Sequence, residues 1–227
     1  MSLKDFKVVV ANQAHFEYAE SICAEMASSA KARGTGIARR TPEYIVQKIR
    51  EGKAVIAFHQ SGAWAGFCYI ETWGHGEYVA NSGLIVAPDF RKSGLAREIK
   101  QKIFELSRTK YPEAKIFGLT TGLAVMKINS ELGYRPVTYS ELTDDDAFWE
   151  GCKSCVNYDI LMSKNRTNCI CTAMLYDPAE KKSSKSKSRF WDFKNQSKIY
   201  ERLIRLKQFS FTKAIEKSKF KPFKKKK

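Results

Sequence analysis

The chain has 227 residues, of which 43% are hydrophobic and 12% aromatic, enough to bury the core of one good-sized domain. Its formal net charge of +16 is unevenly distributed. Residues 181–227 hold 18 of the 40 basic and 3 of the 24 acidic residues, which leaves 22 basic and 21 acidic residues in residues 1–180. The sequence therefore describes a nearly neutral domain with a cationic tail, and a charge-based argument for nucleic-acid binding applies to the tail alone.

No stretch of the sequence indicates a membrane span or a secretory signal. The longest apolar runs, such as Ala54–Phe58, are far shorter than the ~20 residues that a spanning helix needs. The first residues, MSLKDFKVVVANQ, contain no apolar stretch followed by a small-residue cleavage site. Six cysteines without such a signal do not suggest a secreted disulfide scaffold, so we expect a cytoplasmic protein.

The first predicted elements are a short strand and two helices. Phe6–Ala11 is a β-type run, and a helical spacing of apolar residues begins at Asn12 or the residue after it. The loop Ala32–Arg40, rich in glycine and arginine, precedes the second helix. Thr41-Pro42 favours a helix start, because a capping side chain is followed by proline in the first turn, and Gly52 ends this helix.

Strands and helices then alternate along the chain. The predicted strands are Ala54–His59, Ala63–Thr72, Tyr78–Val86, Lys115–Leu119 and Arg135–Thr138, and the predicted helices are Ser93–Lys110 and Ala124–Leu132. Two further β-type regions carry cysteines, Cys155–Met162 and Cys169–Tyr176. This order predicts an α/β fold with a mixed central sheet and helices on both faces.

The predicted elements divide the chain into three parts. Residues 1–145 form the main domain, and residues 146–180 are expected to be a cysteine-rich β extension packed on it. From residue 181 the composition changes to a Lys-rich tail, which begins with the solvated low-complexity linker KKSSKSKSR. Further along the tail, Ser197–Phe211 has the spacing of a basic amphipathic helix.

The stretch from Val86 to Arg97 is the most informative for chemistry. A buried strand ends at Pro88, and a turn containing Gly94 opens directly into a helix. Unpaired backbone N–H groups at the positive end of a helix bind anions such as a pyrophosphate. Basic side chains add to this charge: Arg91, Lys92 and Arg97. On spacing alone, an ordinary strand–loop–helix connection with basic residues is an equal alternative.

The pattern Arg91-x-x-Gly94-x-Ala96 resembles the acyl-CoA pyrophosphate loop of the GNAT (GCN5-related) N-acetyltransferases. Its context is similar too, with an apolar strand ending in Val-x-Pro before the loop and a long helix after it. The segment from Lys127 to Val137, KINSELGYRPV, is similar to the second signature of that family, an aliphatic helix ending in Leu-Gly-aromatic. The two motifs have the order and spacing of the family, and the resemblance covers residues 6–140.

The resemblance implies direct transfer of an acyl group from an acyl-CoA, expected to be acetyl-CoA, to an amine. The strand Tyr78–Val86 would splay from Lys115–Leu119, and the pantetheine arm would lie in the gap. The resemblance implies the following residues for binding the donor: Leu84, Ile85, Val86, Arg91, Lys92, Ser93, Gly94, Leu95, Ala96, Arg97 and Asn129.

Candidate acid and base groups are harder to assign. Glu77, Glu71 and His75 are the titratable residues nearest the expected reaction centre, and Glu77 is the preferred base. Solvated hairpin residues are the alternative interpretation of all three. The family's usual acid is a tyrosine at the position that is Asn129 in this chain, and an asparagine can donate a hydrogen bond to a thiolate but not its proton. Protonation of the thiolate then falls to water or another group.

The loop between the first two helices usually walls the acceptor pocket in the GNAT family. Here it carries Arg39 and Arg40 beside glycines, and arginine forks suit carboxylates. Residues 80–180 also resemble bacterial GNAT proteins associated with arginine biosynthesis. An amino acid such as glutamate is therefore the expected acceptor, with a solvated basic loop as the alternative.

The cysteines form two close pairs, Cys152-x-x-Cys155 and Cys169-x-Cys171. Four thiolates are the right number and type for a tetrahedral structural zinc, although the second pair is tighter than usual. Buried apolar thiols and a redox switch through the first pair are the alternatives.

The cationic tail leaves several partners open: nucleic acid, an anionic surface, the domain itself, or a second subunit in a homodimer. Three functional hypotheses follow from the resemblance and the tail. They are an N-acyltransferase of a small amine or amino acid, a CoA-binding regulator without catalysis, and an acetyltransferase directed to protein or ribosome by the tail.

Overall fold

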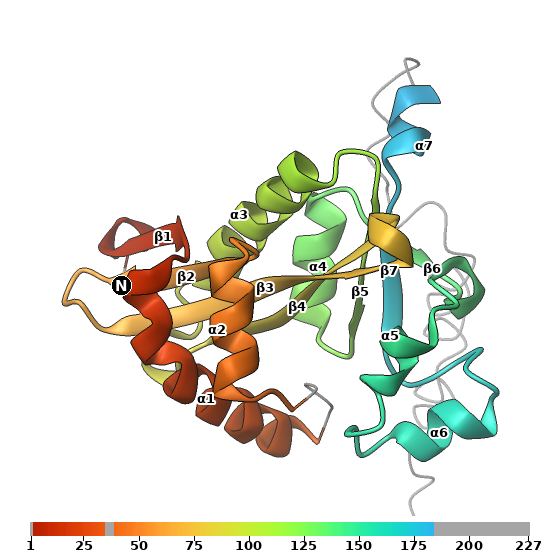
Figure 1. The fold of residues 1–227 in the computed structure, drawn as a ribbon, viewed down its shortest axis with the longest axis horizontal. Helices are drawn as coiled ribbons and strands as arrows, with labels where there is room; N and C mark the ends of the chain where they lie inside the picture. The colour runs from red at the N-terminus through yellow and green to blue at the C-terminus, as the bar shows by residue number, and fades with distance from the viewer. Residues whose placement is uncertain (1, 35–38, 184–227) are drawn as a thin grey trace, which may run out of the picture. The chain divides into compact units, whose positions relative to one another are not determined.

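A seven-stranded mixed sheet forms the centre of the structure, with the strand order β1-β2-β3-β4-β5-β7-β6 (Figure 1). The computed structural model describes residues 2–34 and 39–183, so the Lys-rich tail and the predicted helix at 197–211 lie outside the described residues. Adjacent strands are antiparallel except β4 and β5, which are parallel. The strands are β1 (Phe6–Val10), β2 (Ala54–His59), β3 (Trp64–Trp73), β4 (Tyr78–Val86), β5 (Lys115–Thr120), β6 (Arg135–Val137) and β7 (Thr172–Tyr176).

Helices cover both faces of the sheet, as the element order predicts. They are α1 (Ala19–Arg33), α2 (Pro42–Arg50), α3 (Leu95–Lys110), α4 (Leu123–Glu131), α5 (Asp146–Glu150), α6 (Tyr158–Ser163) and α7 (Pro178–Ser183). The helix predicted from Asn12 begins as a 3₁₀ segment, Gln13–Tyr18, whose first turn is capped by the Asn12 side chain. Within the described residues, no helix is both long and apolar enough to cross a membrane.

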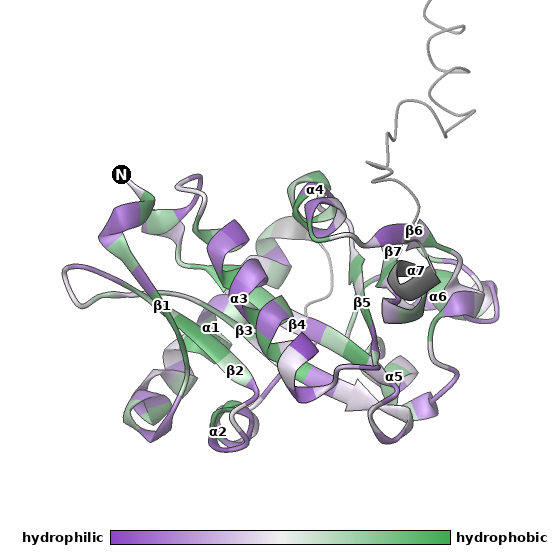
Figure 2. Ribbon diagram, turned by 90° about the horizontal axis from the view of Figure 1, so that it is seen from above, coloured by the Kyte–Doolittle hydropathy of each residue, from purple (hydrophilic) through white to green (hydrophobic). Residues whose placement is uncertain are grey.

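Alternation along the central strands separates two apolar clusters. In β2, Ala54 and Ile56 face α1 and α2, whereas Val55 and Ala57 face α3. Successive residues of a strand point to opposite faces, so this buried run supplies both clusters at once. Figure 2 shows apolar residues along these strands and polar residues interspersed along α3. The predicted mixed α/β fold is thus confirmed.

The cysteine-bearing region after residue 146 differs from the prediction in two respects. Its strand β7 lies inside the central sheet, between β5 and β6, so the region does not merely pack on the core. The β-type prediction for Cys155–Met162 is wrong, because the chain forms α6 there. A short apolar run does not distinguish strand from helix, and the exposed–buried–exposed order of Ile160, Leu161 and Met162 is compatible with both.

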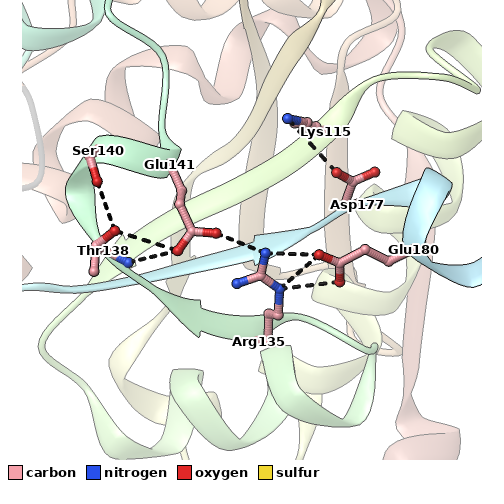
Figure 3. Close-up of polar contacts among 7 residues, drawn as sticks. All are labelled: Lys115, Arg135, Thr138, Ser140, Glu141, Asp177 and Glu180. Atoms are coloured by element: carbon pink, nitrogen blue, oxygen red, sulfur yellow. Dashed lines mark hydrogen bonds and ion pairs between the residues drawn. The ribbon is translucent and has the colours of Figure 1, made fainter.

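Ion pairs tie β6 to the last described helix. Arg135 of β6 donates hydrogen bonds to Glu180 of α7 and to Glu141 in the following 3₁₀ turn (Figure 3). These contacts raise the pKa of Arg135 and lower that of Glu141. Nearby, Lys115 of β5 lies 3.8 Å from Asp177.

Candidate functional site

A cleft opens where β4 and β5 diverge. The two strands pair only from Tyr78 to Ala80, opposite Lys115 to Phe117, and the rest of β4 has no ladder to β5. The cavity in this gap has a volume of about 240 Å³. Four elements supply the lining residues used below: Asn81, Ser82 and Leu84 from β4, Gly118 and Leu119 from β5, Lys100 from α3, and Asn129 from α4.

A bulge at Gly83 shapes the β4 wall of the cleft. The register to β3 shifts between Phe67 and Tyr69, and Gly83 has φ +64°. A Cβ at Gly83 would lie 2.4 Å from both Met26 Cε and Tyr69 Cε1, so only glycine fits there. The bulge lies in the part of β4 that is not paired to β5, and Ser82, Gly83 and Leu84 line the cleft there.

The loop after β4 has the geometry of an anion site. Gly94 precedes α3 with φ +89°, and no side chain caps the helix there. The N–H of Arg97 bonds to the carbonyl of Gly94, and Ser93 Oγ accepts weakly from Leu95 N at 3.4 Å. The first turn of this sixteen-residue helix therefore presents N–H groups and its positive dipole end.

Two of the three predicted cations of this loop are already paired. Arg91 lies 2.6 Å from Glu25 and donates to Ser29, both on α1. Arg97 pairs with Glu131 at the end of α4. These pairs anchor the loop to α1 and α4, whereas Lys92 is exposed and has no ion pair among the described residues.

Asn129 has an orphaned acceptor in the cleft. The residue is only 1% exposed, its Nδ2 lies 3.8 Å from Met174 Sδ, and its Oδ1 has no hydrogen-bond partner. An unsatisfied buried carbonyl costs about 1–3 kcal/mol, so a ligand that donates to it is favoured. The arm of an acyl-CoA carries amide N–H groups, and the residues present therefore fit this donor.

A second cavity, of about 160 Å³, adjoins the cleft. The two cavities share five lining residues: Arg40, Ser82, Leu119, Phe148 and Cys171. The rest of the second cavity is mostly aromatic, aliphatic and thiol-bearing, and includes Trp73, Tyr139, Tyr158 and Leu161. A molecule in the second cavity would therefore reach the interior of the cleft beside Ser82.

Arg40 is the charged residue at this junction. Its Nε donates to Tyr69 Oη at 3.0 Å, and its Nη2 lies 3.4 Å from Glu71 Oε1. Arg39, predicted alongside it, is exposed and lines neither cavity; its backbone N–H donates to Ser154 Oγ. The structure thus brings one of the two predicted substrate arginines to the site.

The predicted carboxylate bases lie outside both cavities. Glu71 is buried between Lys48, 2.8 Å away, and Arg40, and it accepts a hydrogen bond from Tyr44 Oη. Burial and this hydrogen bond raise the pKa of Tyr44. Glu77 is exposed ahead of the paired end of β4, roughly 16 Å along the strand from Ser82.

The third titratable candidate, His75, is also exposed and lines a separate hollow beside Tyr111 and Asp145. Among the described residues that line the cleft and the second cavity there is no aspartate, glutamate or histidine.

The four cysteines of the predicted zinc site surround the second cavity. Burial and the neighbouring thiols raise the pKa of Cys152 to about 11 and that of Cys171 to about 12, so both are thiols near neutral pH. Across the described ranges, no group of three or more histidine, cysteine, aspartate or glutamate residues is arranged to hold a metal ion. The four thiols lie close enough to interact, since Cys169, Cys155 and Cys152 all contribute to the raised pKa of Cys171. They line the second cavity, and the zinc site stays a prediction.

Comparisons with known proteins identify the fold. The solved N-acetylglutamate synthase of Neisseria gonorrhoeae, complexed with coenzyme A and N-acetyl-glutamate, matches 76% of this chain with a TM-score of 0.54 and 16% identity. A GNAT acetyltransferase of Staphylococcus aureus matches 76% of this chain and 99% of its own, with a TM-score of 0.54 and 10% identity. The fold is that of the GNAT acetyltransferases. The resemblance seen in the sequence is thereby confirmed.

In sequence, this chain is similar to a named acetyltransferase. The thialysine N-epsilon-acetyltransferase of Caenorhabditis elegans is 29% identical over 153 residues, which is 65% of this chain and 91% of that protein. No family model matches the chain. This chain spans only 35% of the length of the Neisseria synthase. Other structures with the GNAT fold hold CoA or acetyl-CoA.

Sequence reasoning missed several residues of this GNAT cleft. Gly83 and Gly118 look like ordinary strand glycines, and Phe148 lies in a short helix that was not predicted. Lys100 had a signal: it stands on the apolar side of the predicted helix, next to Ile99 and three residues before Ile103. A polar residue in a buried stripe indicates a buried network or a site.

Proposed function

We propose that this chain is an acetyl-CoA-dependent N-acetyltransferase whose acceptor is the amine of a small carboxylate-bearing molecule, such as an amino acid. The observation that carries the proposal is the continuity of two cavities, one between the splayed strands and one beside Arg40. The GNAT fold, the named relative and the CoA-bound structures of the same fold support acetyl transfer.

The residues of the chain divide the binding task. Amides in the first turn of α3, with Lys92, would hold the pyrophosphate, while Asn129 Oδ1 would accept from an amide of the arm. When bound, acetyl-CoA supplies an acetyl group on a thioester that an amine can attack. Backbone N–H groups of β4 beyond the bulge would stabilise negative charge on the carbonyl oxygen during attack.

Arg40 would select the acceptor. Each of its three guanidinium nitrogens donates one hydrogen bond, to Tyr69, to Glu71 and to the carbonyl of Arg39. Two of its five N–H groups are left for a substrate carboxylate at the junction of the two cavities. The Caenorhabditis relative is named for an amino acid, thialysine, and the Neisseria structure holds N-acetyl-glutamate. Glutamate and lysine-type amino acids are therefore the first acceptors to test.

A thiol-release assay tests this proposal. Full-length protein with acetyl-CoA is expected to turn over with amino acids and not with polyamines that lack a carboxylate. Arg40→Met should raise KM for the amino-acid acceptor about tenfold, because one charge-assisted hydrogen bond to the acceptor is lost. KM for acetyl-CoA should change less than about threefold.

Arg39→Met is the matched control, because Arg39 belongs to the same loop but lines neither cavity. Equal effects of the two substitutions would contradict the acceptor assignment. CoA binding without turnover on any amine would instead support a CoA-binding regulator. This is the second candidate function, because the described residues that line the two cavities include no carboxylate or imidazole base.

A further inference from the structure

Lys100 is a buried cation without a carboxylate partner among the described residues. It lies in the middle of α3, is 2% exposed, and forms no ion pair in the described structure. A buried charge of this kind is costly unless it is hydrogen-bonded or used. Within residues 2–34 and 39–183, the acid–base-capable side chains that face it are Cys68 from β3 and Tyr134 from the turn after α4.

A closed hydrogen-bond network fixes the position of the ammonium group. Lys100 Nζ donates to Asn81 Oδ1 at 3.2 Å, and Tyr134 Oη donates to the same oxygen at 3.1 Å. Asn81 Nδ2 donates to Ser107 Oγ, which donates to the carbonyl of Ile103. The amide of Asn81 is therefore oriented by its partners, and Lys100 keeps two further N–H groups beyond this bond.

The same ammonium group borders the cleft. Lys100 and Asn81 line the cavity between β4 and β5 together with Asn129 and Gly118. Asn129 has no proton to give to a sulfur anion, and no other described residue lining the cleft carries a positive charge apart from Arg40, whose guanidinium bonds to Tyr69 and Glu71. Lys100 is thus the cation left to face the departing sulfur.

We propose that Lys100 stabilises the thiolate that leaves in the cleft and gives it a proton. The proposal rests on the acetyl transfer proposed above. As the amine nitrogen bonds to the acetyl carbon, the carbon–sulfur bond breaks and its electron pair stays on sulfur. A proton moves from the Lys100 ammonium to that sulfur, and the neutral lysine regains one from solvent, which has received the proton lost by the attacking amine.

Burial supports this role, because it lowers the pKa of Lys100 to about 8, close to that of a thiol. Cys68 does not neutralise Lys100, since burial raises its own pKa to about 11 and it donates to the carbonyl of Ser82. Burial also holds the pKa of Tyr134 well above its ordinary value. A purely structural lysine would need neither access to the cleft nor an easily lost proton.

The test compares affinities for CoA and desulfo-CoA by calorimetry between pH 7 and 9.5, because their ratio isolates the sulfur. Three substitutions are made in the full chain: Lys100→Gln, which keeps a donor to Asn81 without charge, Lys100→Met, and Lys102→Met. Lys102 is an exposed lysine on the same helix and serves as the control. Circular dichroism and melting temperature confirm folding of each protein.

The ratio of the affinity for CoA to the affinity for desulfo-CoA should rise with pH. In the wild type and in Lys102→Met this rise should be about tenfold larger than in either Lys100 substitution. A tenfold difference corresponds to a pKa of the bound thiol that is about one unit lower when Lys100 is present. Equal ratios within about twofold in the wild type and folded Lys100→Gln would overturn the role of Lys100. Wild-type protein that binds neither ligand would overturn the proposed function itself, which is a different result.

Discussion

The guanidinium of Arg40 is held 3.4 Å from the carboxylate of Glu71, and Arg40 lines both cavities whereas Glu71 lies behind it and lines neither. Glu71 is buried and also bonds to Lys48 and Tyr44, so it cannot move to follow a substrate. Glu71, one of the predicted bases, therefore holds the guanidinium of Arg40, the residue that we propose to select the acceptor.

Substitution of Glu71 is expected to affect both stability and acceptor binding. Glu71→Gln leaves Arg40 and Lys48 without their counter-charge, and we expect a loss of about 3 kcal/mol in the free energy of unfolding, measured by urea denaturation. KM for the acceptor should rise as Arg40 loses its anchor. Glu51→Gln is the control, because Glu51 pairs with Lys53 at the surface and should cost less than about 1 kcal/mol.

A negative charge at the start of α3 should abolish binding of acetyl-CoA. In Gly94→Glu the carboxylate would repel the pyrophosphate at the helix terminus. Gly62→Glu is the matched control: Gly62 also has positive φ, but it lies in the β2–β3 turn with nothing within 4 Å. Both glycines have positive φ, and a Cβ at Gly94 would in addition lie 3.3 Å from the Leu3 side chain, so the melting temperature of each protein is measured as well. Tight binding retained by Gly94→Glu in calorimetry would refute the placement of the donor.

The bulge in β4 should not tolerate a methyl group. Gly83→Ala is expected to lower the free energy of unfolding by about 3 kcal/mol, because its Cβ would overlap the buried ring of Tyr69 and Met26 Cε. Gly118→Ala, whose Cβ would meet its nearest neighbour at 3.7 Å, should remain near the wild type. Similar denaturation midpoints for both proteins would contradict this prediction, because they would show that β4 can accommodate a methyl group at the bulge.

Loss of the Glu77 carboxylate should leave catalysis unchanged. Glu77 is exposed and lines neither cavity, so Glu77→Gln is expected to keep the pH profile of kcat within about twofold at each pH. A rate that falls selectively at low pH in this variant would restore Glu77 as the base.

The ion pair between Arg135 and Glu141 predicts a small acid-dependent loss of stability. The hydrogen bond from Arg135 lowers the pKa of Glu141 below its ordinary value of 4.5. The folded pKa is the lower one, so the stabilisation is complete above pH 4.5 and is lost as the pH falls through the folded pKa. Because the pair is largely exposed, wild type and Glu141→Gln should differ by about 0.5 kcal/mol at pH 7. The two unfolding curves should approach each other as the pH falls below 4.5, and a constant difference would contradict the linkage.

Much of the sheet followed from local pattern. The strand Tyr78–Val86 was predicted with its observed ends, and the helix Ser93–Lys110 began within two residues of α3. Gly94 followed from the local pattern of a helix start, whereas Asn129 followed from its place in the motif that resembles the GNAT family. The region 155–162 failed because its short apolar run does not reveal which neighbours will bury it.

The sequence by itself determined the order of the elements, the glycine turn that opens α3 and the resemblance to the GNAT family, because each depends on residues a few positions apart. Only the tertiary structure decided which side chains share the site. Arg40 meets Phe148 and Cys171 there, and Lys100 bonds to Asn81, although these partners are distant in the chain. Such contacts depend on where β4 and β5 stop pairing and on the bulge in β4. The spacing of residues along the chain reveals neither of these features.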